Sequence, residues 1–179
     1  MTGRPKDTEA AAFYHGYIQQ VQGDDALAAV EGQLVEAMAL FAGISEERSL
    51  HRYAPEKWSI RQVVNHVADT ERMFGFRLMF FARGFESPLP SFDPNIAAAG
   101  AEADRVAGTR LVEEFRQVRL GTISLLKHLP EEAWRRSGVA SEKTVTVRAL
   151  AFIIPGHVAH HLRILREQYG LPVQYVPKG

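Results

Sequence analysis

Apolar residues recur at spacings of three and four through four long segments of the chain, and this pattern constrains the fold most. The four segments are residues 25–41, 59–83, 109–129 and 147–169. Such spacing lines one face of an α-helix, whereas the sustained alternation of a half-buried strand is not found. Residues 143–147, KTVTV, could pair briefly, and residues 13–21 could form a short extra helix. The sequence therefore predicts an all-α protein built on four helices.

Residues at the segment ends fit this interpretation. Asp25, Ser59 and Thr109 stand where helix N-caps are expected, because their side-chain oxygens can accept hydrogen bonds from free backbone N–H groups. Gly84 and Gly170 follow the second and fourth segments, where glycine commonly ends a helix.

The linker between the second and third segments predicts the topology. Residues 84–108 contain three prolines and several glycines, and a bare loop of this length is unusual in a compact domain. A 25-residue helix is about 37 Å long, and a linker at ~3.3 Å per extended residue can span that distance. The expected fold is a four-helix bundle with an up-down-down-up order and this long crossover. We expect one domain over residues 1–179, with 1–22 as an N-terminal extension or short helix.

Charge and composition exclude several classes of function. The chain has 21 basic and 21 acidic residues, so it lacks the basic excess of a nucleic-acid binder. Its longest apolar run, residues 149–154, is far too short to span a bilayer. It has no cysteine, which excludes disulfides, thiolate metal sites and a cysteine nucleophile. These features favour a soluble cytoplasmic enzyme or binding protein, without nucleic-acid or membrane partners.

The fourth segment places two histidines at the centre of its apolar face. In the sequence PGHVAHH, a helix at about 100° per residue puts His157 and His161 within the stripe of leucines and isoleucines, and His160 on its shoulder. Two imidazoles one turn apart can bind one metal ion. The alternative is a pair of core histidines that hydrogen-bond to nearby polar groups. Position 158 is valine, so the zinc-protease motif HExxH is absent.

The second segment offers two candidates for a third ligand. His66 lies on the flank of its apolar stripe, and Glu71 lies inside the stripe, where a carboxylate is unusual. Glu71 could accept a hydrogen bond from a ligand imidazole, or it could form an internal salt bridge. The helical wheel does not choose between His66 and Glu71. Pro155 leaves a further alternative open, because the fourth helix could either kink there or begin there.

Three stretches of the chain resemble the DinB/YfiT-like superfamily. They are KWSIRQVVNHVADTERMFGFRLMFFARG, PLPSFDPN and TVRALAFIIPGHVAHHLRILREQYG. The resemblance covers roughly residues 14–170 and implies an up-down-down-up bundle with a three-histidine metal site. Carried over residue by residue, the implied ligands are His66, His157 and His161, while His160 falls on an unmatched position. The expected cofactor is one divalent metal ion, with zinc or nickel as the first candidates.

The resemblance implies a range of functions. Some members are metal-dependent thiol S-transferases that use low-molecular-weight thiols, and others are thiol-dependent isomerases or metal-dependent hydrolases. We therefore expect a metal-dependent transferase or hydrolase, with Arg77 and Asp93 as candidates for substrate contact and Glu71 as a supporting residue. The alternative is a non-catalytic, metal-stabilised homodimer. In that case Phe76 and its apolar neighbours Met79 and Phe80 would form the interface.

Overall fold

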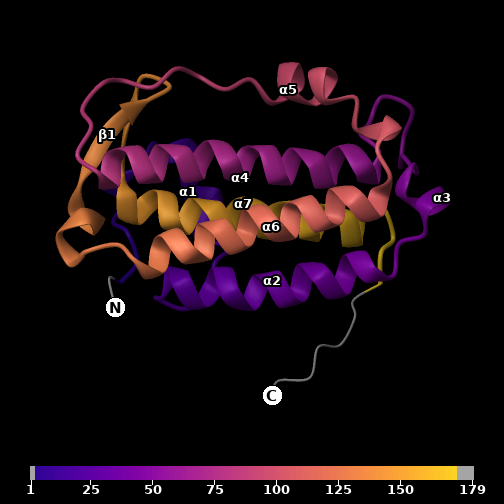
Figure 1. Cartoon of the computed structure of the whole chain (residues 1–179), viewed down its shortest axis with the longest axis horizontal. Coiled ribbons are helices and arrows are strands. Elements are labelled where there is room, and N and C mark those ends of the chain that lie inside the picture. The colour runs from indigo at the N-terminus through magenta and orange to yellow at the C-terminus, as the bar shows by residue number, and fades with distance from the viewer. Residues whose placement is uncertain (1–2, 173–179) are drawn as a thin grey trace.

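Four long helices form the bundle in a computed structural model that describes residues 3–172. They are α2 (Ala26–Ala42), α4 (Ile60–Ala82), α6 (Gly108–Lys127) and α7 (Val147–Glu167) (Figure 1). Shorter helical elements are Asp7–Glu9, Ala12–Tyr14, α1 (His15–Ile18), α3 (Glu46–Ser49), α5 (Pro94–Ala101), Ala103–Arg105 and Glu131–Arg135. The predicted all-α four-helix bundle is confirmed. Of the single domain expected over 1–179, residues 1–2 and 173–179 lie outside the described residues.

Side-chain caps explain where most of the long helices begin. The Asp25 carboxylate accepts from two backbone N–H groups at the start of α2, and Ser59 forms a capping box at the start of α4. The predicted cap of α6 by Thr109 is wrong. The Glu46 carboxylate instead accepts from the N–H groups of Gly108 and Thr109, at 2.8 and 3.0 Å. The start of α6 is therefore capped by a carboxylate from α3, not by the hydroxyl of a residue at the helix start.

Helix α7 runs without a break through Pro155. The helix therefore neither begins at Pro155 nor ends there, and its N-cap is Thr146, whose hydroxyl accepts from Ala149 N–H at 3.0 Å. Gln33 on α2 donates its side-chain N–H to Pro155 O at 2.8 Å. His157 and His161 consequently stand on one continuous helix, one turn apart.

The helix directions give the predicted up-down-down-up order (Figure 1). The starts of α4 and α6 lie at the same end of the bundle, because Glu46 caps α6 and also pairs with Arg61 in the first turn of α4. At the other end, Lys127 of α6 pairs with Glu31 near the start of α2. Thus α4 and α6 are parallel neighbours, and α2 and α7 run in the opposite direction.

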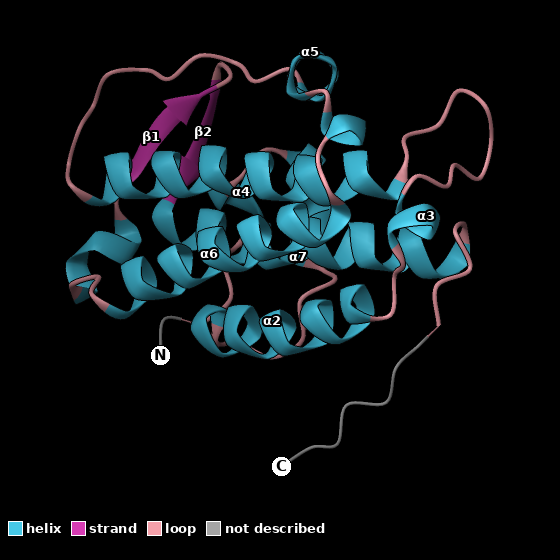
Figure 2. Ribbon diagram, turned by 45° about the vertical axis from the view of Figure 1, so that its right-hand side comes forward, coloured by secondary structure: helices cyan, strands magenta, loops and turns pink. Residues whose placement is uncertain are grey.

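The linker between α4 and α6 crosses the length of the bundle, as expected, but it is not a bare loop (Figure 2). It contains α5, and Leu89 pairs with Ala140 of a small antiparallel hairpin. This hairpin consists of β1 (Ser137–Ala140) and β2 (Lys143–Thr146). The stretch KTVTV therefore does pair, with a partner strand that lacks an alternating pattern of its own.

The N-terminal segment, residues 4–21, packs across α7. Its α1 backbone approaches so closely that a Cβ atom added at Gly156 would lie 2.2 Å from Tyr17 O. Arg4 holds the segment's end by donating to the carbonyls of Ile18, Val21 and Gly23. The segment therefore covers the face of α7 that carries the histidines.

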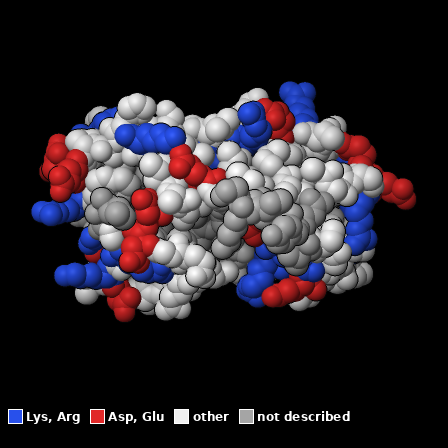
Figure 3. All heavy atoms as spheres, turned by 90° about the horizontal axis from the view of Figure 1, so that it is seen from below, with Lys and Arg blue, Asp and Glu red and all other residues white. Residues whose placement is uncertain are grey.

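The surface and the core both fit a folded bundle. The face in Figure 3 shows basic and acidic side chains interspersed, without a large patch of one sign. Within the described residues, no helix combines the length and the apolar character needed to cross a bilayer.

The core of the bundle contains one buried ion pair among the described residues. Arg119 is 0% exposed and binds Glu71, which is 2% exposed.

Candidate metal centre

Three histidine side chains converge between α4 and α7. His66 Nε2 and His161 Nε2 each lie 3.1 Å from His157 Nε2. One ring nitrogen from each residue falls within 4.8 Å of the other two. His66 is 7% exposed and His157 is 5% exposed. We call these three residues the histidine triad.

Hydrogen bonding alone cannot satisfy this arrangement. The Nε2 atom of a neutral imidazole carries either one proton or one lone pair, so it makes one good hydrogen bond. His157 Nε2 has two imidazole nitrogens at 3.1 Å, so one contact would be left unsatisfied in a buried place. A cation between the rings would take a lone pair from each, and tetrahedral zinc–nitrogen bonds put ligand nitrogens about 3.3 Å apart. The triad therefore fits a metal ion better than a hydrogen-bonded cluster.

Burial keeps the triad neutral. Desolvation, followed by repulsion from His160, lowers the pKa of His66 to about 4. Desolvation, with smaller contributions from His66 and His160, lowers the pKa of His161 to about 3. The pKa of His157 is also well below its usual value, mainly through desolvation. All three rings are therefore neutral at pH 7, the form that ligates metals.

A hydroxyl on α4 lies beside the His66 ring. Thr70 Oγ lies 3.3 Å from His66 Nδ1, one turn along the helix. If Nδ1–H donates to this oxygen, the lone pair of His66 is on Nε2, which faces the other two rings.

The triad lies in an open pocket of about 290 Å³ with aromatic walls. Trp58 packs against the His66 ring at 4.8 Å between centroids, and Tyr17 packs edge-on against His157 at 5.5 Å. Phe13, Tyr14, Met73, Phe74 and Phe92 complete most of the apolar lining. The site thus combines three neutral imidazoles with an apolar cavity large enough for a small molecule.

His160 lies beside the triad, with its ring 5.1 Å from the His161 ring. Its ring packs on Tyr17 at 5.5 Å and its Nδ1 lies 3.5 Å from an Arg163 nitrogen. Burial and the Arg163 charge lower the pKa of His160. It lines the pocket but does not join the group of converging nitrogens.

The other three candidate residues lie in different places. Glu71 is paired with Arg119, which donates to its Oε2 at 2.7 and 3.0 Å, and no hydrogen bond joins it to a triad ring within the described residues. Arg77 is 4% exposed and lines the pocket. Asp93 is exposed and caps α5 by accepting from two backbone N–H groups. Only Arg77 among these three therefore lies at the pocket.

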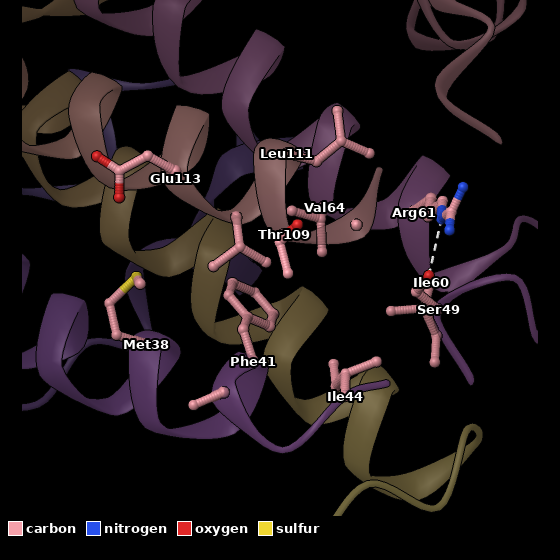
Figure 4. Close-up of a pocket in the computed structure, with 13 residues that line it drawn as sticks. Met38, Phe41, Ile44, Ser49, Ile60, Arg61, Val64, Thr109, Leu111 and Glu113 are labelled. Atoms are coloured by element: carbon pink, nitrogen blue, oxygen red, sulfur yellow. Dashed lines mark hydrogen bonds between the residues drawn. The ribbon is translucent and has the colours of Figure 1, made fainter. Parts of the chain in front are cut away.

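A second cavity of about 230 Å³ lies on the opposite side of α4, between α2 and α6 (Figure 4). Its walls are mainly apolar, and its Arg61 and Ser49 side chains are bound to each other at 2.7 Å. This second cavity contains no histidine among its lining residues, unlike the triad pocket.

The sequence reasoning missed the pocket's aromatic walls. Trp58 precedes α4, and Tyr17 and Phe13 belong to the segment expected as an N-terminal extension or short helix. The sequence spacing of Tyr17 and Phe13 carries no sign of this role, because it depends on how residues before α2 pack against α7.

Several solved structures share the fold of this chain. YfiT from Bacillus subtilis, described as a probable metal-dependent hydrolase with an unusual four-helix bundle topology, has a TM-score of 0.66 at 17% identity, over 94% of each chain. A mycothiol-dependent maleylpyruvate isomerase has a TM-score of 0.67 at 12% identity, over 83% of this chain and 61% of that one. The DinB-like protein YjoA from Bacillus subtilis has a TM-score of 0.58 at 17% identity, over 82% of this chain and 95% of that one.

Identities this low establish the common fold only, and none of the curated proteins matches the chain significantly. The sequence model of the DinB superfamily, however, matches residues 29–165, which include α4, α6 and the whole triad. The chain therefore belongs to the DinB superfamily.

Proposed function

We propose that His66, His157 and His161 hold one divalent metal ion, zinc or nickel, in a metal-dependent enzyme that acts on small molecules. The reaction class we favour is thiol transfer or hydrolysis. A cytoplasmic location and a single structural domain are parts of the same proposal.

The observation that carries the proposal is the convergence of three Nε2 atoms on one point. His157 Nε2 has a neighbouring imidazole nitrogen at 3.1 Å on each side, which one proton or one lone pair cannot satisfy. Three protein ligands are also the number typical of catalytic zinc sites, which keep a coordination position open, whereas structural zinc sites use four.

The residues around the triad have separate tasks. Thr70 fixes the His66 ring, while the rings of Tyr17 and Trp58 exclude water from two sides. A bound divalent ion would supply a nucleophile at neutral pH by lowering the pKa of a water or thiol. The pocket of about 290 Å³ limits the substrate to a small molecule. Two similar folds, described as a probable metal-dependent hydrolase and a mycothiol-dependent isomerase, favour this range of chemistry.

The first experiment is elemental analysis of the purified chain after reconstitution with zinc or nickel. We expect one ion per chain, lost in His157→Ala. The matched control is His160→Ala, which removes an imidazole from the same helix and pocket but not from the converging group. A full equivalent of metal in His157→Ala would refute the site. A screen of metal-loaded protein for thiol transfer and hydrolysis then tests the reaction class.

An exposed aromatic patch supports a second candidate, a metal-stabilised homodimer without catalytic activity. Phe76 is 50% exposed and Phe85 is 55% exposed, and both contact the Phe80 ring on the outer face of α4. Exposed apolar patches commonly mark interaction sites. Light scattering should then show a dimer that Phe76→Glu dissociates, and the metal-loaded protein should fail the activity screen.

A further inference from the structure

Two arginines are buried in the described part of the bundle, and they differ in how their charges are neutralised. Arg119 is 0% exposed and is paired with the Glu71 carboxylate at 2.7 Å. Arg77 is 4% exposed, and no carboxylate lies within ion-pair distance of it among the described residues. A buried cation without a counter-ion is costly, so its presence needs an explanation.

The contacts of Arg77 leave much of its guanidinium unused. Its Nη2 atom donates to Pro90 O at 2.8 Å and to Ser141 Oγ at 3.1 Å, and both acceptors are neutral. Its Nε and Nη1 atoms have no hydrogen-bond partner in the described chain, yet neither is among the fully enclosed polar atoms that lack one. These two donors therefore still reach open space, and the open space beside Arg77 is the triad pocket.

Arg77 shares one face of α4 with His66, the member of the triad on that helix. It follows His66 by eleven residues, close to three full turns, which is a rise of about 16 Å along the helix. Thr70 and Phe74 lie between them on the same pocket wall. The pocket therefore has nitrogen ligands at one end, an apolar middle and an unpaired cation at the other end.

We propose that Arg77 is the carboxylate-binding residue of this pocket and that the substrate is an elongated, mainly apolar carboxylic acid. The inference rests on the proposed function for the end of the substrate that would react at the triad. For the anionic end of the substrate it rests on Arg77 alone. A guanidinium presents parallel N–H donors that match the two oxygens of a carboxylate. A single cation beside one serine hydroxyl neutralises a single negative charge.

The test compares two probes, 4-phenylbutanoate and its neutral analogue 4-phenylbutanamide, by calorimetric titration of the full chain loaded with zinc. The wild-type protein should bind the carboxylate at least tenfold more tightly than the amide, because a hydrogen-bonded charge pair would replace an unpaired buried charge. Arg77→Gln removes the charge but keeps a polar side chain, and should reduce the ratio to near one. Any affinity of the carboxylate for zinc itself is common to the wild-type protein and Arg77→Gln, so the difference between their ratios reports on Arg77.

Ser141→Ala is the matched control, since it removes one neutral contact of Arg77 and leaves the cation. It should keep the preference for the carboxylate. An unchanged ratio in Arg77→Gln, or no preference in the wild-type protein, overturns the proposal, and the second outcome does not depend on how any variant folds. Zinc content is measured on the same samples. Zinc binding without a carboxylate preference overturns this inference alone, whereas an Arg77-dependent preference in a chain that binds no zinc overturns the metal site alone.

Discussion

Replacing Gly156 with alanine should separate the N-terminal segment from α7. Gly156 is buried in α7, and a Cβ atom there would meet three backbone atoms of Tyr17, the nearest at 2.2 Å and the next at 2.5 Å. Ordinary contacts for such an atom are longer than 3.4 Å, so the α1 backbone would have to move by more than an ångström. Backbone atoms cannot rotate aside as a flexible side chain could.

The expected magnitude follows from two opposing effects. Alanine in place of a helical glycine stabilises a helix by about 1 kcal/mol, while overpacking a filled interior costs about 1–3 kcal/mol. Gly32 on α2 provides the matched control, because a Cβ atom there would meet nothing within 4 Å. Gly32→Ala should therefore raise the free energy of unfolding. The propensity gain is common to both variants, so the free energy of unfolding of Gly156→Ala should be lower than that of Gly32→Ala by the overpacking cost, about 1–3 kcal/mol.

Urea denaturation measures the stability of both variants, and limited proteolysis reports whether residues 4–21 have become accessible. In Gly156→Ala we expect faster cleavage in this segment and weaker binding of 4-phenylbutanoate, because Tyr17 would leave its place at 5.5 Å from the His157 ring. The argument fails if Gly156→Ala is as stable as Gly32→Ala and binds the probe as the wild-type protein does.

The remaining predictions concern the buried polar groups. His66 and His161 have pKa values of about 4 and about 3 in the folded chain. An unfolded histidine titrates near ~6.5, so the unfolded state binds more protons below that pH. The metal-free protein should therefore lose stability as the pH falls from 6.5 towards 4, by about 3 kcal/mol for His66 alone. Urea titrations across this range test it, His161→Phe should flatten the decline, and stability independent of pH would contradict it. At pH 7.5 excess chelator should lower the melting temperature of the metal-loaded protein, and an unchanged melting temperature would count against a bound ion. Glu71→Gln should cost about 3–5 kcal/mol by leaving Arg119 buried without its partner. The double change Glu71→Leu with Arg119→Met should restore much of that loss, and a stable single variant would show that the pair is dispensable.

The sequence predicted those parts of the fold that depend on local periodicity. The apolar stripe of residues 147–169 placed His157 and His161 on the buried face, and the length of residues 84–108 predicted the crossover. Both predictions depend on spacing along one segment. Neither requires knowledge of which side chain on another helix lies opposite.

The parts that sequence reasoning missed depend on contacts between distant segments. The helical wheel could not choose between His66 and Glu71, because what distinguishes them is Arg119 on α6, 48 residues from Glu71. The cap of α6 was assigned to Thr109 because local sequence offers no sign of Glu46, which caps the helix from 63 residues away. Long-range partners such as these are set by packing, which periodicity does not describe.

The close approach at Gly156 brings a segment from outside the superfamily match against α7, where it forms part of the pocket wall. The superfamily match begins at residue 29, whereas Phe13, Tyr14 and Tyr17 precede it. A chain shortened to the matched region would keep every nitrogen of the triad and lose one wall of the cavity. A different segment at this position would change the lining of the cavity beside the triad while the four-helix scaffold stays unchanged.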